Sequence, residues 1–212
     1  MRALLLFAAT AAAAVGCGKA KEGDGGDGPS VTPRVVPPTT VTRNWKDFSS
    51  GRHEFKVSFP WGDPTERPGT LERLKAFVGD STAYCAENWQ QDPQTKQSKV
   101  ADEFCIVAGK FGKSATKAAR DDAVQYLLRS VATPKGGAKS EPKAITWAER
   151  PATETVYAGE EKDGKKPRVI VRQLLTDAVV YLGVVRDAGG LTDAEVARFF
   201  NSFEVTPAGK PK

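Results

Sequence analysis

Residue types that commonly carry enzyme chemistry are few in this sequence, which has one histidine, His53. Any histidine-based triad or multi-histidine metal site within the chain must therefore use it. His53 stands at the polar start of a strand-like run, where we expect it on the surface. The acidic neighbours Asp121-Asp122 and Glu160-Glu161 would point in different directions on a helix or strand, so they do not form an acid/base pair. With no G-x-S-x-G, phosphate-loop or H-E-x-x-H motif either, we predict no catalytic residue, metal or cofactor.

The beginning of the chain resembles a bacterial lipoprotein signal peptide. Arg2 is followed by an apolar stretch, residues 3–15, that is too short to span a bilayer, and the run AVGC ending at Cys17 is similar to a lipobox. This resemblance implies that residues 1–16 are removed and that Cys17 carries a diacylglycerol thioether and an added acyl chain such as palmitate. Ala14 departs from the leucine that the lipobox prefers, so cleavage by signal peptidase I without lipidation stays the alternative.

Residues 17–42 are rich in glycine, charge and then proline, without an apolar period. Such a segment buries too little surface to order itself, so we expect a flexible tether behind the lipidated cysteine. Two or three acyl chains would hold the protein on the membrane. Gly18 is not the aspartate that often retains lipoproteins at the inner membrane, which favours the periplasmic side of the outer membrane.

The expected partners follow from this anchor and from the charge pattern. The formal net charge is +5, but lysines and arginines are interleaved with acidic residues along the chain. This pattern indicates a solvated surface and no nucleic-acid partner. We therefore expect the membrane as a partner through the lipid, together with an envelope protein or envelope polymer.

Cys85 and Cys105 lie in two strand-like runs, residues 82–90 and 103–111, that a polar stretch separates. This order predicts a β-hairpin. If its arms pair symmetrically about Thr95, Cys85 falls opposite Cys105, as Tyr84 does opposite Ile106 and Ala86 opposite Phe104. Two cysteines left over in an oxidising compartment then predict a structural disulfide rather than a redox or metal pair.

Other periodic runs predict further strands and two helices. Residues 178–185, AVVYLGVV, are apolar on both faces, which predicts a central strand with helical cover on each side. Thr192 begins a capping box, with Leu191 and Val196 as a hydrophobic staple. The remaining expected elements are a helix at 114–132, capped by Ser114 or Thr116, and strands at 55–59, 74–78, 144–149, 153–159, 168–175 and 203–205.

Two packing motifs carry a resemblance to a known group of proteins. The run FKVSFP from Phe55 and the run RFFNSFEV up to Val205 resemble a recurrent group of uncharacterised bacterial secreted proteins with a PsbP-like α/β/α sandwich. The resemblance implies an α+β fold, with a curved, mainly antiparallel sheet of about six to seven strands and helices packed on its faces. The expected single domain covers residues 43–206, followed by a disordered tail at 207–212. A binding or assembly role is implied, and no catalytic residue is transferred.

The leading prediction for function is a non-enzymatic, membrane-anchored binding or assembly module of the cell envelope. Tryptophans at strand ends form ligand platforms in many proteins, and a groove is expected near Trp61 and Trp89 if one exists. Two alternatives stay open. An envelope hydrolase using scattered carboxylates predicts a deep acidic cleft with a perturbed carboxyl pKa. A small-ligand-binding lipoprotein predicts an apolar pocket lined by tryptophan.

Overall fold

The computed structural model describes residues 43–68, 78–91, 95–112, 115–131, 138–161 and 164–206. Cys17 and the predicted signal peptide, tether and tail lie outside these residues. Most of the strand expected at 74–78 does so too. Among the described residues, none of the helices has the length and apolar character needed to cross a bilayer.

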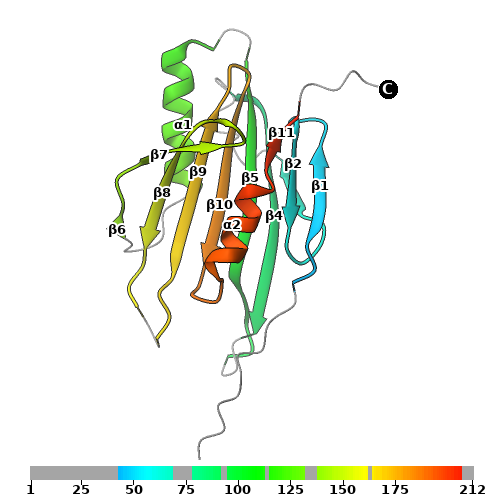
Figure 1. The fold of residues 1–212 in the computed structure, drawn as a ribbon, viewed down its shortest axis with the longest axis vertical. Helices are drawn as coiled ribbons and strands as arrows, with labels where there is room; N and C mark the ends of the chain where they lie inside the picture. The colour runs from blue at the N-terminus through cyan, green and yellow to red at the C-terminus, as the bar shows by residue number, and fades with distance from the viewer. Residues whose placement is uncertain are drawn as a thin grey trace, which may run out of the picture. The chain divides into compact units, whose positions relative to one another are not determined.

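Most of the described chain is antiparallel β-structure (Figure 1). The strands are β1 (Lys46–Ser50), β2 (Phe55–Phe59), β3 (Thr65–Pro68), β4 (Val78–Gln91), β5 (Ser98–Phe111), β6 (Ala138–Lys139), β7 (Lys143–Trp147), β8 (Arg150–Ala158), β9 (Arg168–Leu175), β10 (Val179–Asp187) and β11 (Glu204–Val205). The helices are α1 (Lys117–Val131) and α2 (Asp193–Asn201).

The main sheet has the order β3-β4-β5-β10-β9-β8-β6, with β7 also paired to β8. Its central strand β10 is buried at every position except Arg186. The predicted central place of this strand is therefore confirmed. The pairing of β4 with β5 is confirmed as well, since Cys85 lies opposite Cys105, Tyr84 opposite Ile106 and Ala86 opposite Phe104.

The predicted α+β sandwich is wrong, because the structure is a mainly antiparallel β fold with two sheets and with two helices among its described residues. The strands β1, β2 and β11 form a separate small sheet. The polar run KDFSS of β1 has no apolar alternation, so its backbone pairing with β2 left no pattern to find. The strand at Phe55–Phe59 therefore belongs to this second sheet. The second sheet packs against part of a face of the main sheet that we expected helices to cover.

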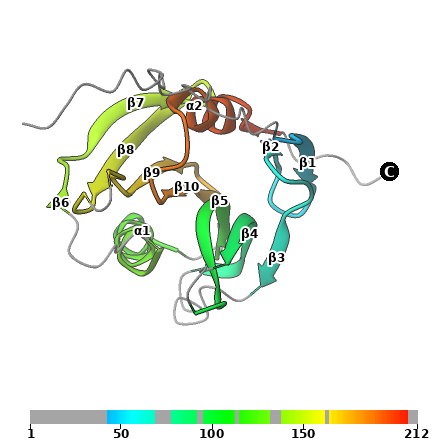
Figure 2. The same cartoon turned by 90° about the horizontal axis from the view of Figure 1, so that it is seen from below.

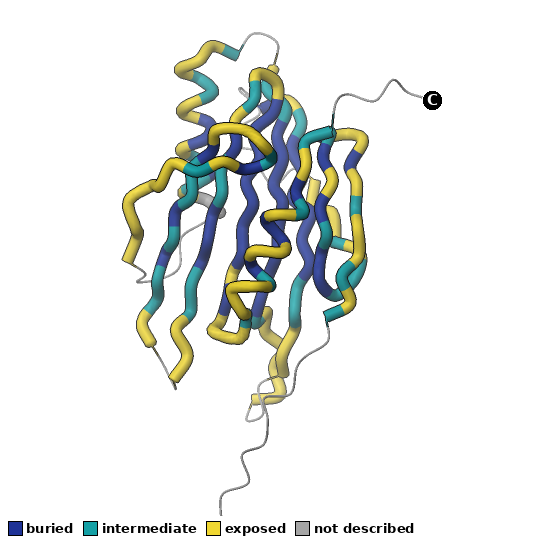
Figure 3. The backbone as a smooth tube through the Cα atoms, viewed as in Figure 1, coloured by how far each residue is buried: buried dark blue, intermediate teal, exposed yellow. Residues whose placement is uncertain are grey.

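Two apolar clusters lie on opposite sides of the main sheet (Figure 2). On one side, aromatic residues of β2 and α2 pack against the side chains of Tyr84, Phe104 and Tyr181. On the other, Ala123, Val124 and Leu127 of α1 pack against the face that carries the two cysteines. Figure 3 shows the buried residues concentrated in the central strands, while the strand ends are exposed. One helix thus covers one face, and the small sheet and the second helix share the other.

Both helices begin where the sequence predicts a cap. The hydroxyl of Thr116 accepts a hydrogen bond from the backbone N–H of Ala119 at 3.2 Å, so α1 starts directly after Thr116. At α2, the side chain of Thr192 and that of Glu195 form the complete capping box. The capping box satisfies backbone donors at the end of α2 that faces Arg43, whose guanidinium pairs with Glu195.

Candidate functional site

A hollow of about 570 Å³ lies beside the last turn of α2, a size typical of small-ligand sites. We call it the Trp147 hollow. Its walls come from the β7–β8 turn, the C-terminal end of α2, the start of β11 and one residue of β9. The lining residues are Thr146, Trp147, Ala148, Glu149, Arg172, Phe200, Asn201, Phe203, Glu204 and Val205.

The rim of the Trp147 hollow is a two-residue turn in which Trp147 pairs with Arg150. Ala148 has φ 49° and Glu149 has φ 60°, so both occupy the left-handed region. Tight hairpin turns of this kind usually contain Asn-Gly or Asp-Gly, because other residues lose about 1–2 kcal/mol each in this conformation. Such strained backbone often marks functional sites, and here it sets the edge of the hollow.

Arg172 supplies the positive charge of the Trp147 hollow. Its Nε donates to Glu154 Oε2 at 2.8 Å, and its guanidinium carbon lies 4.3 Å from the centre of the Phe200 ring. These contacts hold a planar cation, with its charge paired to Glu154, against the face of a buried aromatic ring. Among the described lining residues, there is no histidine, cysteine or serine that would act as a base or nucleophile.

The structure does not bring Trp61 and Trp89 together. Trp61 packs against Phe104, with the two ring centroids 5.5 Å apart, and so lies on the α2 side of the main sheet. Trp89 follows Cys85 by four residues on β4, so it points to the same side of the sheet, the side that α1 covers. Trp89 is 58% exposed. Neither residue lines the Trp147 hollow. The hollow instead uses the tryptophan at the end of β7.

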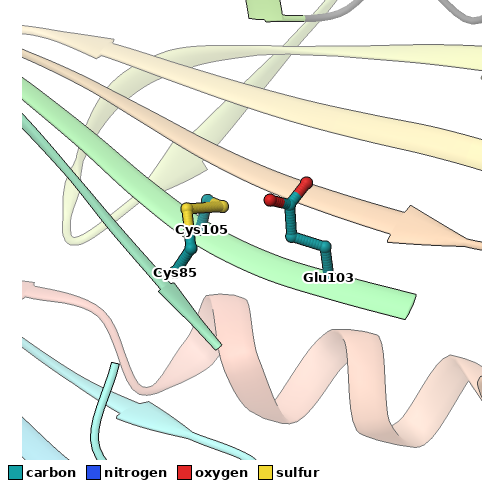
Figure 4. A group of neighbouring side chains, drawn as sticks. All are labelled: Cys85, Glu103 and Cys105. Atoms are coloured by element: carbon teal, nitrogen blue, oxygen red, sulfur yellow. A yellow bond between two sulfur atoms is a disulfide. The ribbon is translucent and has the colours of Figure 1, made fainter. Parts of the chain in front are cut away.

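Cys85 and Cys105 are joined across β4 and β5, with their sulfurs 2.09 Å apart (Figure 4). The predicted disulfide is thus present in the structure. A carboxylate oxygen of Glu103 and the two sulfurs lie within 4.8 Å of one another. Metal binding by cysteine requires thiolates, and sulfurs tied in a disulfide do not provide them. In the oxidised protein, Cys85 and Cys105 therefore act as a cross-link between β4 and β5.

Glu103 is a buried carboxyl in a network of charges. It lies opposite Glu87 on β4, and it pairs with Arg186 at 3.0 Å and with Arg67 at 3.5 Å. Burial raises the pKa of Glu103, and the charge of Glu87 adds to this increase, whereas the two arginines oppose it. Glu103 does not line the Trp147 hollow, so its raised pKa serves no acid catalysis there.

The expected surface position of His53 is wrong, because its side chain is 0% exposed. Its Nδ1 lies 2.9 Å from the hydroxyl of Tyr84, and its backbone N–H donates to the Ser50 hydroxyl. Ser50 ends β1, the strand that had no sequence pattern, and the connection from β1 to β2 places His53 between the small sheet and Tyr84. Polar flanks indicated exposure, but the ring packs edge-on against Tyr84, with the two ring centroids 5.8 Å apart.

The far side of the His53 ring has no hydrogen-bond partner among the described residues. Its Nε2 lies 3.8 Å from Asp80, whose carboxylate accepts two hydrogen bonds of 2.6 Å from Arg52. Burial lowers the pKa of His53, and the charge of Asp80 opposes this effect only in part. The imidazole is therefore neutral at neutral pH, and no substrate reaches it to exchange a proton.

This burial predicts a loss of stability in mild acid. The unfolded chain takes up a proton on His53 near its ordinary pKa of 6.5, whereas the folded chain does so only at lower pH. The contribution of His53 to the free energy of unfolding should therefore be fully present above pH 6.5 and decrease as the pH falls below this value. Urea unfolding between about pH 7.5 and about pH 5 measures this change.

A His53→Gln variant is the matched control, since it removes the titrating ring. The raised pKa of Glu103 acts in the opposite direction, because the stability that it contributes is lost as the pH rises above 4.5. Both proteins contain Glu103, so the difference between the two pH profiles isolates the contribution of His53. Parallel profiles would show that the ring is not buried in the neutral form.

Trp147 and Arg172 were not singled out by the sequence as site residues. The strand predicted at 144–149 included Ala148 and Glu149, whereas the structure ends β7 at Trp147 and uses these two residues as the turn, without the glycine or asparagine that usually marks one. Arg172 stands within a regular strand and gives no local signal.

Neither the comparison with protein-family models nor that with curated proteins finds a match to this chain. The site is therefore defined by its geometry.

Proposed function

We propose that this chain is an exported lipoprotein, acylated on Cys17, whose globular part is a non-enzymatic binding module of the cell envelope. Its binding site is the Trp147 hollow, and its ligand is an envelope component. The observation that carries this proposal is the composition of the hollow. It is bordered by the buried rings of Trp147, Phe200 and Phe203 and by one fixed arginine, and its described lining residues include no histidine, cysteine or serine.

The position of the only histidine supports a binding role. A general base must reach the proton that it abstracts, either directly or through one water. His53 is fully buried and bound to Tyr84, away from the hollow. Histidine-based hydrolysis by a single chain is therefore not favoured.

A carboxylate-based hydrolase is the second candidate, since Glu149 and Glu204 both line the hollow. Both residues are exposed, so water solvates their charges. A glycosidase of this kind needs one carboxyl kept protonated by an apolar environment. Burial raises the pKa of Glu103, but this carboxyl lies outside the lining of the hollow. Binding is therefore favoured over hydrolysis.

Lipidation is tested on material from the native host. We expect the intact mass of the mature protein to begin at Cys17 and to include a diacylglycerol and an added acyl chain. A Cys17→Ser variant should lose this mass and leave the membrane fraction, because each buried methylene of an acyl chain contributes about 0.8 kcal/mol. An unacylated mature N-terminus would overturn the anchor.

Turnover assays test the non-enzymatic part of the proposal separately. The purified protein should not cleave glycosidic, ester or peptide substrates at enzyme-like rates. If it does, and if Glu149→Gln or Glu204→Gln abolishes the activity, the hydrolase assignment replaces the binding role whatever the state of Cys17.

A further inference from the structure

The β4–β5 hairpin extends beyond the strands that flank it. The pairing of β3 with β4 ends at Cys85, and that of β10 with β5 ends at Glu103. Past these points, the two arms pair with each other as far as Gln91 and Ser98. Six residues of β4 and five residues of β5 therefore have no partner in a flanking strand, and the outer four of each arm, 88–91 and 98–101, extend the hairpin by roughly 13 Å. The disulfide lies at the base of this extension.

An exposed apolar pair lies on the extended part of the hairpin. Trp89 is 58% exposed and Val100 is 37% exposed, and the two are direct partners across the strands. Opposed residues of an antiparallel pair share one face of the sheet, so these side chains form one patch. The residues around it are polar: Gln90, Gln91, Lys96, Gln97, Ser98 and Lys99.

Other chain segments meet at the same end of the domain, which we call the hairpin end. Asp187 at the end of β10 pairs with Arg168 at the start of β9, so the β8–β9 connection lies there. The N-terminal turn of α2 lies there too, and Arg43, the first described residue, binds its Glu195 (Figure 1). The first described residue of the chain thus lies at the hairpin end.

The hairpin end carries exposed lysines from two separate loops. The lysines are Lys96 and Lys99 of the hairpin, and Lys165 and Lys166 of the β8–β9 connection. The exposed acidic residues described in that connection are Glu160 and Glu161, while Asp193 is paired with Arg168 at 2.8 Å. Among the described residues of the hairpin and the β8–β9 connection, four exposed lysines thus stand against two exposed glutamates, and this excess of positive charge complements a layer of anionic headgroups.

We propose that the hairpin end docks on an anionic phospholipid bilayer, with Trp89 and Val100 entering the headgroup interface. The inference rests on the proposed acylation of Cys17 for its setting. Residues 17–42 extend at most about 90 Å, so an acylated Cys17 keeps the hairpin end at high local concentration over the membrane. The indole suits the interface because it joins an apolar ring to a hydrogen-bond donor.

The test uses the full protein purified from host membranes and reconstituted into vesicles of phosphatidylglycerol and phosphatidylcholine with brominated acyl chains. Bromine quenches tryptophans that enter the bilayer. We expect quenching in the wild type and its loss in a Trp89→Phe variant, since the other tryptophans pack against the domain. A Leu175→Ser variant is the matched control, because Leu175 is 40% exposed at the opposite end of β9. It should keep the quenching.

Mass spectrometry of the same samples separates this inference from the proposed function. An acylated protein without Trp89 quenching overturns the docking and leaves the anchor in place. If the protein carries no lipid, the anchor fails, and docking is judged by sedimentation of that protein with the same vesicles. Binding that weakens about fivefold for each of Lys96→Gln and Lys99→Gln then supports docking, and absence of binding overturns it.

A second copy of the chain is the competing occupant of the Trp89–Val100 patch. Sedimentation velocity in detergent without phospholipid distinguishes a second copy of the chain from the bilayer as the occupant. A dimer that Trp89→Phe dissociates would assign the patch to self-association and overturn membrane docking. A monomer under these conditions, with quenching in vesicles, supports the bilayer as the occupant.

Discussion

A Trp147→Ala variant is expected to lose about 4 kcal/mol of the free energy of unfolding. Trp147 is 3% exposed, and its ring stacks on Phe203 with the centroids 4.3 Å apart. Its Nε1 donates to the carbonyl of Phe200 at 2.8 Å, near the end of α2. The substitution removes a large buried ring and the shorter of two hydrogen bonds to that carbonyl, which also accepts from the backbone N–H of Phe203 at 3.4 Å. Equilibrium unfolding in guanidinium measures the loss.

Trp89→Ala is the matched control for this variant. It removes the same side chain from an exposed site, where substitutions usually change stability by less than about 0.5 kcal/mol. Equal losses in the two variants would contradict the burial of Trp147. The Trp147→Ala protein should also lose ligand binding at the hollow, because one wall of the hollow is missing.

Gly183 offers a second check on the packing of Trp147. A Cβ atom at this position of β10 would lie 2.8 Å from Cη2 of Trp147 and 2.9 Å from Cε1 of Phe200. Gly183→Ala should therefore cost about 1–3 kcal/mol in the wild type. In the Trp147→Ala background the cost should be smaller, since one of the two obstructing rings is absent. A double-mutant cycle with no coupling would contradict this contact.

Replacing both disulfide cysteines, Cys85→Ala with Cys105→Ala, is expected to lower the free energy of unfolding by about 3 kcal/mol. The two residues are 20 positions apart, and the bond limits the freedom of that loop in the unfolded chain. Thermal and urea unfolding of the oxidised wild type and of the variant measure the difference.

Reduction provides the control for the disulfide variant. A dithiol reductant should destabilise the wild type by a similar amount and leave the variant unchanged. Two free thiols in the denatured, unreduced wild type would show that the bond is absent from the protein in solution. Because Cys85 and Cys105 stand where the hairpin leaves the sheet, the variant should also show weaker docking of the hairpin end.

The sequence determined the features that depend on neighbouring residues and on symmetry within one hairpin. Alternating apolar residues and a polar loop were enough to place Cys85 opposite Cys105. The apolar run of β10 was enough to place it at the centre of the sheet, and Thr192 with Glu195 marked the start of α2. In each case the signal lies within a short stretch, where side-chain period and capping act locally.

Tertiary structure alone decided the second sheet, the burial of His53 and the position of the hollow. The strand β1 forms through backbone hydrogen bonds to β2, which leave no trace in the side-chain pattern, and His53 is held by Ser50 at the end of β1 and by Tyr84 of β4. The hollow joins Trp147 of β7 to Arg172 of β9 and Phe200 of α2, residues far apart in the sequence. Their meeting depends on how the sheets and α2 pack, which no local pattern records.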